Sequence, residues 1–364
     1  MTNRIIDIAD QPARLSAGGG LLKIGAGNGP ERTIPFQHVA AIVCSHGQIT
    51  FTQAVLAELA GVNGILVVCD AKHLPVAMML PLVTHSLQTT KFHTQAIAGV
   101  ALRKRIWRGI VQAKILAQAR VLVQLHGHDN GLSGTARQVR VGNASHLEAA
   151  AARTYWPLLF GDRDYRRSDH EDGRNALLNY GYAVVRAIVA RALCGTGLHP
   201  GLPLHHHNQA DPYPLANDCM EPFRPLVDEW VAGWCASRPG PWKVDKESKE
   251  PLLARLTGRF SDGKESRSLF DWAQQTADRL ARCLEGTRNT VDIPSIGHAE
   301  GEREAGSEEE DRERVPRDVA ADAVRRAGVD EGAAAGVHGV SETAPEGGFH
   351  STPVERLRQV RGER

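Results

Sequence analysis

The spacing of apolar residues changes near His85, and this change limits the chain to a fold in two parts. Before it, apolar runs are short and separated by turns rich in Gly, Pro and Asn, as in IIDI, LLKIG, HVAAIVC and GILVVCD. Such runs predict strands. One segment, AVLAELAGVNG, has helical spacing and ends in glycine, which predicts a short helix. We therefore expect residues 1–85 to form a compact β domain with one helix.

After His85 the apolar positions follow a helical period. Residues 92–125 contain little Pro or Gly, and Ile106, Ile110, Ala113 and Leu116 recur on one face, which predicts a long amphipathic helix. Segments with the same period and length follow at 144–160, 174–194, 215–236 and 267–286. We therefore expect an α-helical domain over residues 86–290, in a chain of the α+β class.

The last part of the chain, residues 291–364, has little with which to build a core. No aromatic residue occurs between Trp272 and Phe349, and GSEEEDRER and DEGAAAG are of low complexity. Too little apolar area is available to offset the loss of chain entropy on folding. We expect a disordered C-terminal tail.

The formal net charge of +1 averages two unlike regions. Residues 1–290 hold 33 Lys and Arg against 25 Asp and Glu, whereas residues 291–364 hold 10 against 17. Within the basic part, residues 91–147 contain nine basic side chains opposed by Asp129 alone. A soluble surface usually mixes signs, so this stretch predicts contact with a polyanion such as a DNA backbone. The candidate DNA-binding residues are those of the long helix: Arg103, Lys104, Arg105, Arg108 and Lys114.

Several features predict a cytoplasmic protein with no membrane contact. No apolar run approaches the roughly 20 residues needed to cross a bilayer. Asp7 and Asp10 interrupt the start of the chain, where a signal peptide would need a continuous apolar stretch. The six cysteines form no Cys-x-x-Cys pair, and most lie in apolar runs, which predicts buried, reduced thiols.

Three separate segments carry side chains that could bind a metal ion. Glu148 lies early in a predicted helix, with Asn143 or Ser145 as its N-cap. A second segment, LHHHN, belongs to a loop rich in Pro and His, and in the third Asp218 and Glu221 are three residues apart, which places both on one helical face. Two carboxylates and an imidazole suit Mg²⁺ or Mn²⁺. Such an ion would neutralise charge on a phosphodiester and lower the pKa of the attacking hydroxyl or water.

Each of these residues also has an ordinary explanation when taken singly. A glutamate near a helix start is usually solvated, and adjacent histidines are more often exposed than ligating.

Other candidate sites in the chain are weaker. Ser45, His46 and Asp70 lack the Gly-x-Ser-x-Gly turn of a hydrolase, and the Gly18–Gly20 cluster lacks the Lys-Ser/Thr of a phosphate loop and predicts a hairpin turn. Tyr180 and Tyr182 fit helix packing, or a phenol near a phosphate.

Taken in order, several long motifs resemble one known family. They are EAAAARTYW, NALLNYGYAVVRAIVARAL, GLHP with HHHN, and LANDCMEPFRPLVD, preceded by TIPFQHVAAIV, QITFTQAVLAELAGVNGILVVCDAKHLPVAMMLPLVTHS and AKILAQ. Together they resemble the CRISPR-associated endonuclease/integrase of spacer acquisition, the first, catalytic subunit of the adaptation complex. The type II variant is the most similar, and the resemblance covers about residues 3–288.

The resemblance implies a fold, an activity and partners. The fold is an N-terminal β-sandwich domain, which mediates dimerisation, followed by an all-α catalytic domain. The activity inserts spacer DNA into a CRISPR array by 3′-hydroxyl transesterification, with metal-dependent cleavage of DNA. The implied partners are double-stranded DNA, a second copy of the chain, a small second adaptation subunit that completes a heterohexamer, and the type II effector nuclease.

The resemblance also implies a ligand set. The metal ligands and catalytic residues fall on Glu148, His206 and Glu221, with Asp218 as a supporting acid, and the cofactor is Mg²⁺ or Mn²⁺. The triple histidine leaves His205 as a rival to His206.

One departure from the family pattern supports an alternative function. Pro203 stands where the type II pattern has glycine before the histidines. A shifted loop would make the protein a non-catalytic DNA-binding scaffold of the same complex. A hydrolase of small phosphoesters is a more remote alternative, because a small substrate does not need an extended basic surface. The sequence does not specify the spacer length, the repeat sequence, or the choice between Mg²⁺ and Mn²⁺.

Overall fold

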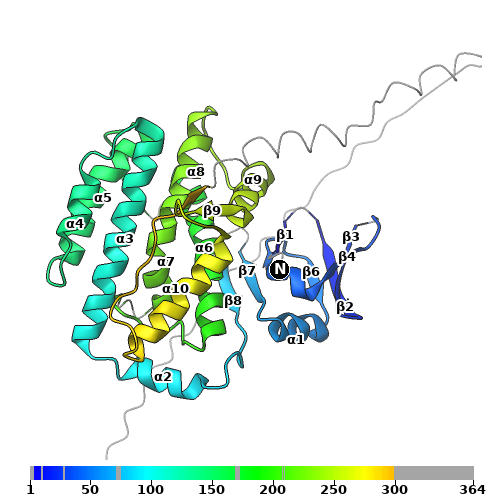
Figure 1. The fold of residues 1–364 in the computed structure, drawn as a ribbon. Helices are drawn as coiled ribbons and strands as arrows, with labels where there is room; N and C mark the ends of the chain where they lie inside the picture. Colours follow the sequence, from blue (N-terminus) through cyan, green and yellow to red (C-terminus); the bar gives the residue numbers. More distant parts are fainter. Residues whose placement is uncertain are drawn as a thin grey trace, which may run out of the picture. The chain divides into compact units, whose positions relative to one another are not determined.

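Among the residues that the structure describes, the short N-terminal apolar runs build two four-stranded sheets (Figure 1). The computed structural model describes residues 4–9, 11–27, 29–70, 75–168, 173–206, 208 and 210–298. The first sheet has the order β1-β5-β7-β8, with β1, β5 and β7 parallel and β8 antiparallel at the edge. The second has the order β4-β3-β2-β6. The strands are β1 (Arg4–Ile8), β2 (Ala13–Gly18), β3 (Leu21–Ala26), β4 (Arg32–Pro35), β5 (Val39–Cys44), β6 (Ile49–Phe51), β7 (Ile65–Cys69) and β8 (Pro75–Met79).

Strand β5 of the first sheet is buried on both faces. Alternate residues of β5 divide between two cores: Ile42 and Cys44 pack with the second sheet and with helix α1 (Gln53–Gly61), whereas Ala41 and Val43 pack toward the C-terminal helices. This two-sided burial explains why HVAAIVC is continuously apolar rather than alternating. The Gly19 and Gly20 turn between β2 and β3 has positive φ at both residues, which confirms the expected hairpin.

Helices dominate the described chain from residue 88 onward. They are α2 (Gln88–Ala96), α3 (Val100–His126), α4 (Leu132–Gln138), α5 (Ala144–Phe160), α6 (Gly173–Thr196), α7 (Pro214–Met220), α8 (Arg224–Ala236), α9 (Lys246–Thr257) and α10 (Leu269–Leu284), with short 3-10 turns η1 (Phe36–His38) and η2 (Glu221–Phe223). The expected single helix over 92–125 is two helices, because the chain turns at residues 97–99 and α3 begins after Gly99.

The expectation of an all-α second part is wrong at one place. Strands β9 (Arg259–Ser261), β10 (Ser266–Ser268) and β11 (Gly297–His298) form a small antiparallel sheet. Its short strands are Ser- and Arg-rich and lack the apolar alternation that would have revealed them. The described residues belong to one compact unit. The tail, expected to be disordered over residues 291–364, was predicted to begin too early. Residues 291–298 are described, with Val291, Ile293 and Ile296 buried and Gly297–His298 paired in β11. From residue 299 on, the predicted tail lies outside the described residues.

Helix α6 is the central helix of this unit. It contacts α7, α8, α9 and α10, and it also packs on β7 and β8. Within the described part of the chain it is long and apolar enough to cross a membrane by length and composition, but 83% of its most apolar window is buried inside the protein. This is the position of a core helix. All six cysteines fall within the described residues, and five of them are buried.

A buried polar cluster joins the first sheet to the helices. Asp7 of β1 accepts a hydrogen bond from Ser45 (2.8 Å) and lies 3.7 Å from the ammonium of Lys249 in α9. The Tyr180 hydroxyl of α6 lies 3.5 Å from the same carboxylate. The side chain of Lys249 is 2% exposed, and its Nζ has no hydrogen-bond partner among the described residues. Ser45 therefore has a structural contact here, as expected for a residue outside a hydrolase site.

Replacing Lys249 by methionine removes a buried ammonium and leaves the Asp7 carboxylate without its counter-charge. We expect the free energy of unfolding to fall by about 3 kcal/mol, as for other broken buried ion pairs. Adding Asp7→Asn to this variant should recover part of that stability, because no unpaired charge remains. Urea unfolding measures both changes, with the exposed Lys243→Met as the control. A Lys249→Met protein as stable as wild type would contradict the ion pair.

Candidate active site

Two of the predicted ligands meet at a lysine where α3, α5 and η2 pack together. The Lys114 ammonium lies 2.6 Å from Oε1 of Glu148 and 2.5 Å from Oε2 of Glu221. The three side chains are 14%, 20% and 5% exposed. Lys114 shares the inward face of α3 with the buried Trp107 and Ile110. The structure thus places Lys114 in the site, whereas the sequence grouped it with the basic surface.

Glu221 is held in its ionised form. Its Oε1 accepts a hydrogen bond from Arg224 at 2.8 Å, and its Oε2 is buried with no hydrogen-bond partner among the described residues beyond the ion pair to Lys114. Burial raises the pKa of this carboxyl, but Arg224 and Lys114 outweigh burial and lower the pKa to about 2. A buried, ionised carboxylate whose second oxygen faces only a cation is a suitable metal ligand.

Asp218 holds the backbone of the loop that contains the histidines. This loop, residues 199–206, is called the histidine loop below. This fully buried carboxylate accepts hydrogen bonds from the backbone N–H groups of Leu204 (2.7 Å), His205 (3.0 Å) and His206 (3.3 Å), and lies 2.5 Å from Nδ1 of His206. The hydrogen bond to Asp218 is the main cause that raises the pKa of His206. With Nδ1 engaged, Nε2 is the nitrogen left to bind a ligand, as in carboxylate–histidine–metal arrangements.

Asp218 and Glu221 therefore have different tasks, although the sequence placed them on one helical face. Asp218 lies near the end of its helix and faces the histidine loop, whereas Glu221 begins a 3-10 turn and faces Lys114. The turn contains Pro222, which has no N–H to donate and disfavours continuation of a regular helix.

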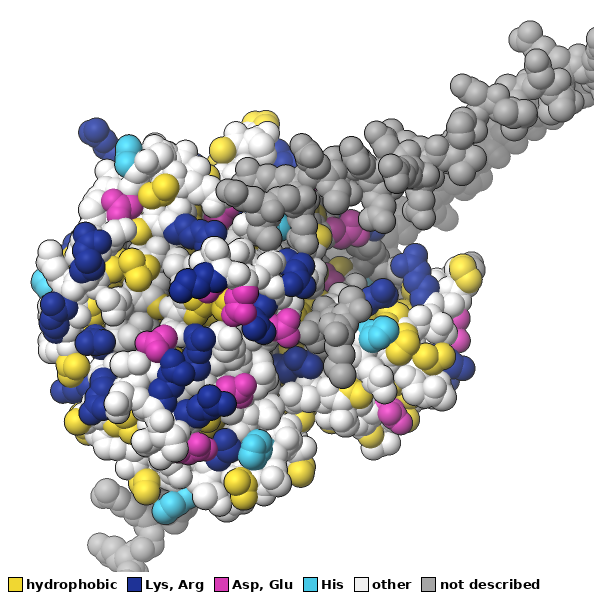
Figure 2. Space-filling model, in the orientation of Figure 1, with side chains coloured by type: hydrophobic (Ala, Val, Ile, Leu, Met, Phe, Trp, Pro, Cys, Tyr) yellow, Lys and Arg dark blue, Asp and Glu magenta, His cyan; other side chains and the backbone are white. Residues whose placement is uncertain are grey.

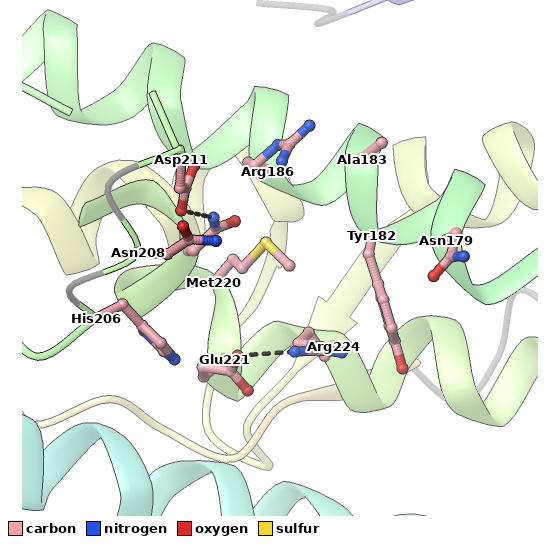
Figure 3. Close-up of a pocket in the computed structure, with 11 residues that line it drawn as sticks. Asn179, Tyr182, Ala183, Arg186, His206, Asn208, Asp211, Met220, Glu221 and Arg224 are labelled. Carbon is pink, nitrogen blue, oxygen red and sulfur yellow. Dashed lines mark hydrogen bonds and ion pairs between the residues drawn. The ribbon is translucent and has the colours of Figure 1, made fainter. Parts of the chain in front are cut away.

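His205, the residue before His206, contacts Trp107 and Ser145. The His205 ring stacks on Trp107, with centroids 4.3 Å apart and planes 11° apart, and its Nε2 lies 3.2 Å from the Ser145 hydroxyl of α5. His206 instead lines a cavity with Glu221, toward which its ring points (Figure 3). This geometry favours His206 over His205. His207 lies outside the described residues.

The first half of the histidine loop is fixed by Gln95 of α2. Its amide nitrogen donates to the carbonyl oxygens of His199 (2.9 Å) and Leu202 (3.0 Å), and its amide oxygen accepts from the His199 N–H (2.9 Å). Gln95 is 6% exposed. Pro203 lies between the two anchored stretches. The Gln95 anchor ends at the Leu202 carbonyl oxygen and the Asp218 anchor begins at the Leu204 N–H, so the N–H that proline lacks is not needed by either.

The donor set fits a divalent cation, but a lysine now fills the position between the carboxylates. Among the described residues, no group of three His, Cys, Asp or Glu side chains converges closely enough to hold a metal ion. The Lys114 ammonium bridges Glu148 and Glu221, so this position already carries a positive charge. Two carboxylate oxygens and an imidazole nitrogen are ligands that Mg²⁺ and Mn²⁺ accept.

A family model described as CRISPR associated protein Cas1 matches residues 6–239. The chain belongs to the Cas1 family. It is 37% identical over 204 residues to the CRISPR-associated endonuclease Cas1 of Neisseria meningitidis, a match that covers 55% of this chain and 66% of that relative, just under two thirds of its length.

Solved structures share the Cas1 fold. The similar ones include a casposase bound to integration product (TM-score 0.65, 17% identity, 81% of this chain and 94% of that one). They also include a Cas6-RT-Cas1–Cas2 complex (TM-score 0.63, 16% identity, 80% of this chain and 36% of that one). At these identities the likeness establishes the fold.

Basic side chains of this Cas1 protein gather outside the cavity. Figure 2 shows Lys and Arg outnumbering Asp and Glu over the face that carries α3, α4 and α5. Of the predicted DNA-binding residues, Lys104 and Arg105 are exposed and Arg103 and Arg108 are half-buried. A further basic hollow of about 590 Å³ was missed by sequence reasoning, because its residues come from α5 and the loop after it: Arg153, Trp156, Arg163, Tyr165, Arg166 and Arg167.

Replacing Lys114 by methionine keeps the aliphatic stem and removes the ammonium between Glu148 and Glu221. We expect the free energy of unfolding at pH 7 to fall by about 2 kcal/mol, because two carboxylates would face each other without a cation between them. The pKa of Glu221 should then rise from about 2 toward its ordinary value of 4.5.

The pH dependence of this variant follows from that change. In wild type, the lowered pKa of Glu221 adds stability that is present above pH 4.5 and disappears as the pH falls toward 2. Urea unfolding from pH 7 to pH 3 should show a smaller decrease in Lys114→Met, with the exposed Lys104→Met as the control. Identical profiles for the variant and wild type would contradict the bridge.

Proposed function

We propose that this protein is a metal-dependent DNA endonuclease and integrase that inserts spacer DNA into a CRISPR array. The observation that carries the proposal is the pair of carboxylates, Glu148 and Glu221, bridged by the Lys114 ammonium. Glu221 also lines an open cavity of about 620 Å³ together with His206, whose ring is oriented by Asp218. The names of its relatives support it, since one is an endonuclease and another a casposase bound to integration product.

The residues of the site have separable roles. Glu148, Glu221 and Nε2 of His206 would hold the cation, which when bound neutralises charge on the phosphodiester and lowers the pKa of the attacking hydroxyl or water. Asp218 fixes the ring of His206, and Arg224 keeps Glu221 ionised. With a cation between the two carboxylates, Lys114 would give up that position, and its ammonium would be available to a phosphate oxygen.

The reaction is an exchange of one phosphodiester for another. The 3′-hydroxyl of the spacer loses its proton and forms a bond to a phosphorus of the repeat, while the bond from that phosphorus to the leaving 3′-oxygen breaks and this oxygen takes up a proton. With water in place of the spacer hydroxyl, the same step cleaves DNA. The number of phosphodiester bonds is conserved in the exchange, so no energy source is needed.

The proposed partners are double-stranded spacer and repeat DNA, a second copy of the chain, and the small second adaptation subunit in a heterohexamer. The Cas6-RT-Cas1–Cas2 complex among the structural neighbours supports an adaptation partner. The likeness of the motifs to the type II variant makes the type II effector nuclease a further proposed partner. The proposed location is the cytoplasm, and the proposed cofactor is Mg²⁺ or Mn²⁺.

A second candidate function is a non-catalytic scaffold that binds DNA within the same complex. It is favoured by one observation, the lysine ammonium that fills the position between Glu148 and Glu221. In this case DNA binding and assembly would be retained while no metal concentration supports cleavage.

Glu221→Ala should abolish both DNA nicking and strand transfer. We expect joining to fall below about 1% of wild type, because removing even a ligand's supporting partner costs 10–100-fold. The assay gives a labelled duplex and a supercoiled plasmid carrying a repeat to the protein and its second subunit, with Mn²⁺ or EDTA. Duplex binding by fluorescence anisotropy should change less than about twofold, since phosphate contacts elsewhere dominate affinity.

Glu58→Ala, at an exposed glutamate of α1, serves as the matched control. Retained joining in Glu221→Ala would overturn the site assignment. A wild-type protein that binds the duplex but joins nothing at any Mn²⁺ concentration would favour the scaffold.

Changing Lys104 and Arg105 together to glutamine should weaken duplex binding to a similar extent for any sequence. Phosphate contacts release counterions, so the slope of log affinity against log salt should become shallower by about 1 for each phosphate-binding side chain removed, or about 2 for the pair. Anisotropy titrations from low to moderate salt measure the slope. Lys264→Gln, at an exposed lysine between β9 and β10, is the control. An unchanged slope would remove α3 from the DNA-binding surface.

A further inference from the structure

The histidine loop has no regular secondary structure, yet it must present His206 at a fixed position. Its backbone is held at two places by two buried side chains. Asp218 binds the N–H groups of residues 204–206, and Gln95 binds both ends of residues 199–202. The stretch has a further backbone hydrogen bond, from the Leu215 N–H to the Pro200 carbonyl oxygen (2.9 Å), but it belongs to no sheet or helix ladder. Removing either anchor should therefore let the loop open more often.

All three side-chain hydrogen bonds of Gln95 go to the backbone of the histidine loop. Gln95 comes from α2, more than a hundred residues away in sequence, and both polar atoms of its amide are used. A glutamine amide is both donor and acceptor, so it can bind a carbonyl oxygen and an N–H of the same residue, as it does at His199. A ring contact between Phe92 of α2 and His199, with centroids 5.2 Å apart, adds to the attachment.

The position of α2 is itself fixed. The Thr84 hydroxyl, just before α2, donates to the carbonyl oxygen of Cys194 in α6, and Lys91 forms an ion pair of 3.0 Å with Glu285 at the end of α10. Helix α2 is also the next helix or strand in the chain after β8, the edge strand of the first sheet. Because α2 is fixed in this way, the Gln95 side chain holds residues 199–202 at a fixed place relative to α2. These residues lead into the loop that carries His206.

We propose that Gln95 is a positioning residue for the metal site: it sets the place of His206 through the backbone of residues 199–202. This inference rests on the proposed function and adds a residue that touches neither metal nor DNA. It predicts that removal of the Gln95 amide weakens metal binding while leaving the chemistry intact once metal is saturating. A residue that merely stabilised the fold would lower stability without changing metal affinity.

The first test uses hydrogen exchange on the metal-free protein. Gln95→Met has nearly the shape of glutamine but lacks the amide, so the His199 N–H is left without its partner. We expect the backbone amides of residues 199–206 to exchange about tenfold faster than in wild type, while those of α3 and α6 are unchanged. Thr94→Ala is the matched control, since the Thr94 hydroxyl bonds within α2, to the Thr90 carbonyl. Unchanged exchange in residues 199–206 would overturn the inference.

The second test measures affinity for Mn²⁺ from the electron paramagnetic resonance signal of the free ion. We expect Gln95→Met to bind Mn²⁺ about tenfold more weakly, within the range seen for supporting partners of metal ligands. Strand transfer should need correspondingly more Mn²⁺ but should reach the wild-type rate at saturation. Equal Mn²⁺ affinity in the variant and wild type would overturn the inference.

A second variant keeps the question decidable if Gln95→Met folds poorly. Gln95→Glu retains an acceptor for the His199 N–H but places a carboxylate against the carbonyl oxygens of His199 and Leu202, so it should weaken Mn²⁺ binding at least as much. Wild-type affinity in a folded Gln95→Glu protein would overturn the inference. A wild-type protein that neither binds Mn²⁺ nor joins DNA would overturn the proposed function, and with it the role of Gln95 at a metal site. Faster hydrogen exchange at residues 199–206 in the metal-free variant would then show only that the Gln95 amide holds the backbone of this loop.

Discussion

The close packing of α6 against its neighbours is the constraint on which the rest of this structure depends. At Gly181 a Cβ atom would overlap the side chain of Val227 in α8 and lie 3.4 Å from Leu252 of α9, so only glycine allows this approach. The residues on either side both donate to carboxylates: Tyr180 to the half-buried Asp7 of the first sheet, and Tyr182 to the buried Asp228 of α8. The motif NYGY thus joins sheet and helices through one turn of helix. The same helix lines the cavity with Tyr182 and Arg186.

The site brings charged side chains from several elements into a place with little water. Lys114 comes from α3, Glu148 from α5 and Glu221 from η2. Burying one carboxylate is costly, and burying two close together is costlier still unless cations lie between or beside them. Here Lys114 and Arg224 supply those charges, and they lower the pKa of Glu221 although burial acts in the opposite direction. The same electrostatic demand that makes the lysine bridge favourable would be met by a divalent cation. Lys114 and Arg224 thus stabilise the buried carboxylate of Glu221 by ion pairs within the chain itself.

Much of the fold could be predicted from apolar spacing, and the failures have physical causes. The segments around α5, α6 and α10 have clear helical periods, and their predicted bounds lie within two or three residues of the observed ones. Helix α9 was missed because Pro251 lies inside it and its first turn is charged, so its evidence is the capping box of Asp245 and Ser248 rather than a period. The predicted helix over 215–236 is interrupted at Glu221 by a 3-10 turn, which patterns of polarity do not reveal. The division into domains at residue 85 stays a prediction.

In the candidate site, too, sequence motifs predicted some residues, whereas others could be recognised only from their contacts in the folded chain. Glu148, His206 and Glu221 were predicted from long motifs in a fixed order, and the structure brings Glu148 and Glu221 to one lysine. Their role as metal ligands stays a prediction. Lys114 and Gln95 were not found in these roles, because a lysine on a basic helix and a glutamine on a short polar helix look like surface residues until the partner elements are known. Their functions depend on what lies opposite them: two carboxylates in one case, the backbone of an irregular loop in the other.

Pro203 illustrates the converse, since its departure from the family pattern suggested a disturbed loop. Proline removes one backbone donor and fixes φ, so it disturbs a loop only where that donor or another φ is needed. The Gln95 anchor ends at the carbonyl oxygen of Leu202, and the Asp218 anchor begins at the N–H of Leu204. Both anchors therefore act at positions that the proline does not occupy, and the substitution leaves the hydrogen bonds that hold His206 in place.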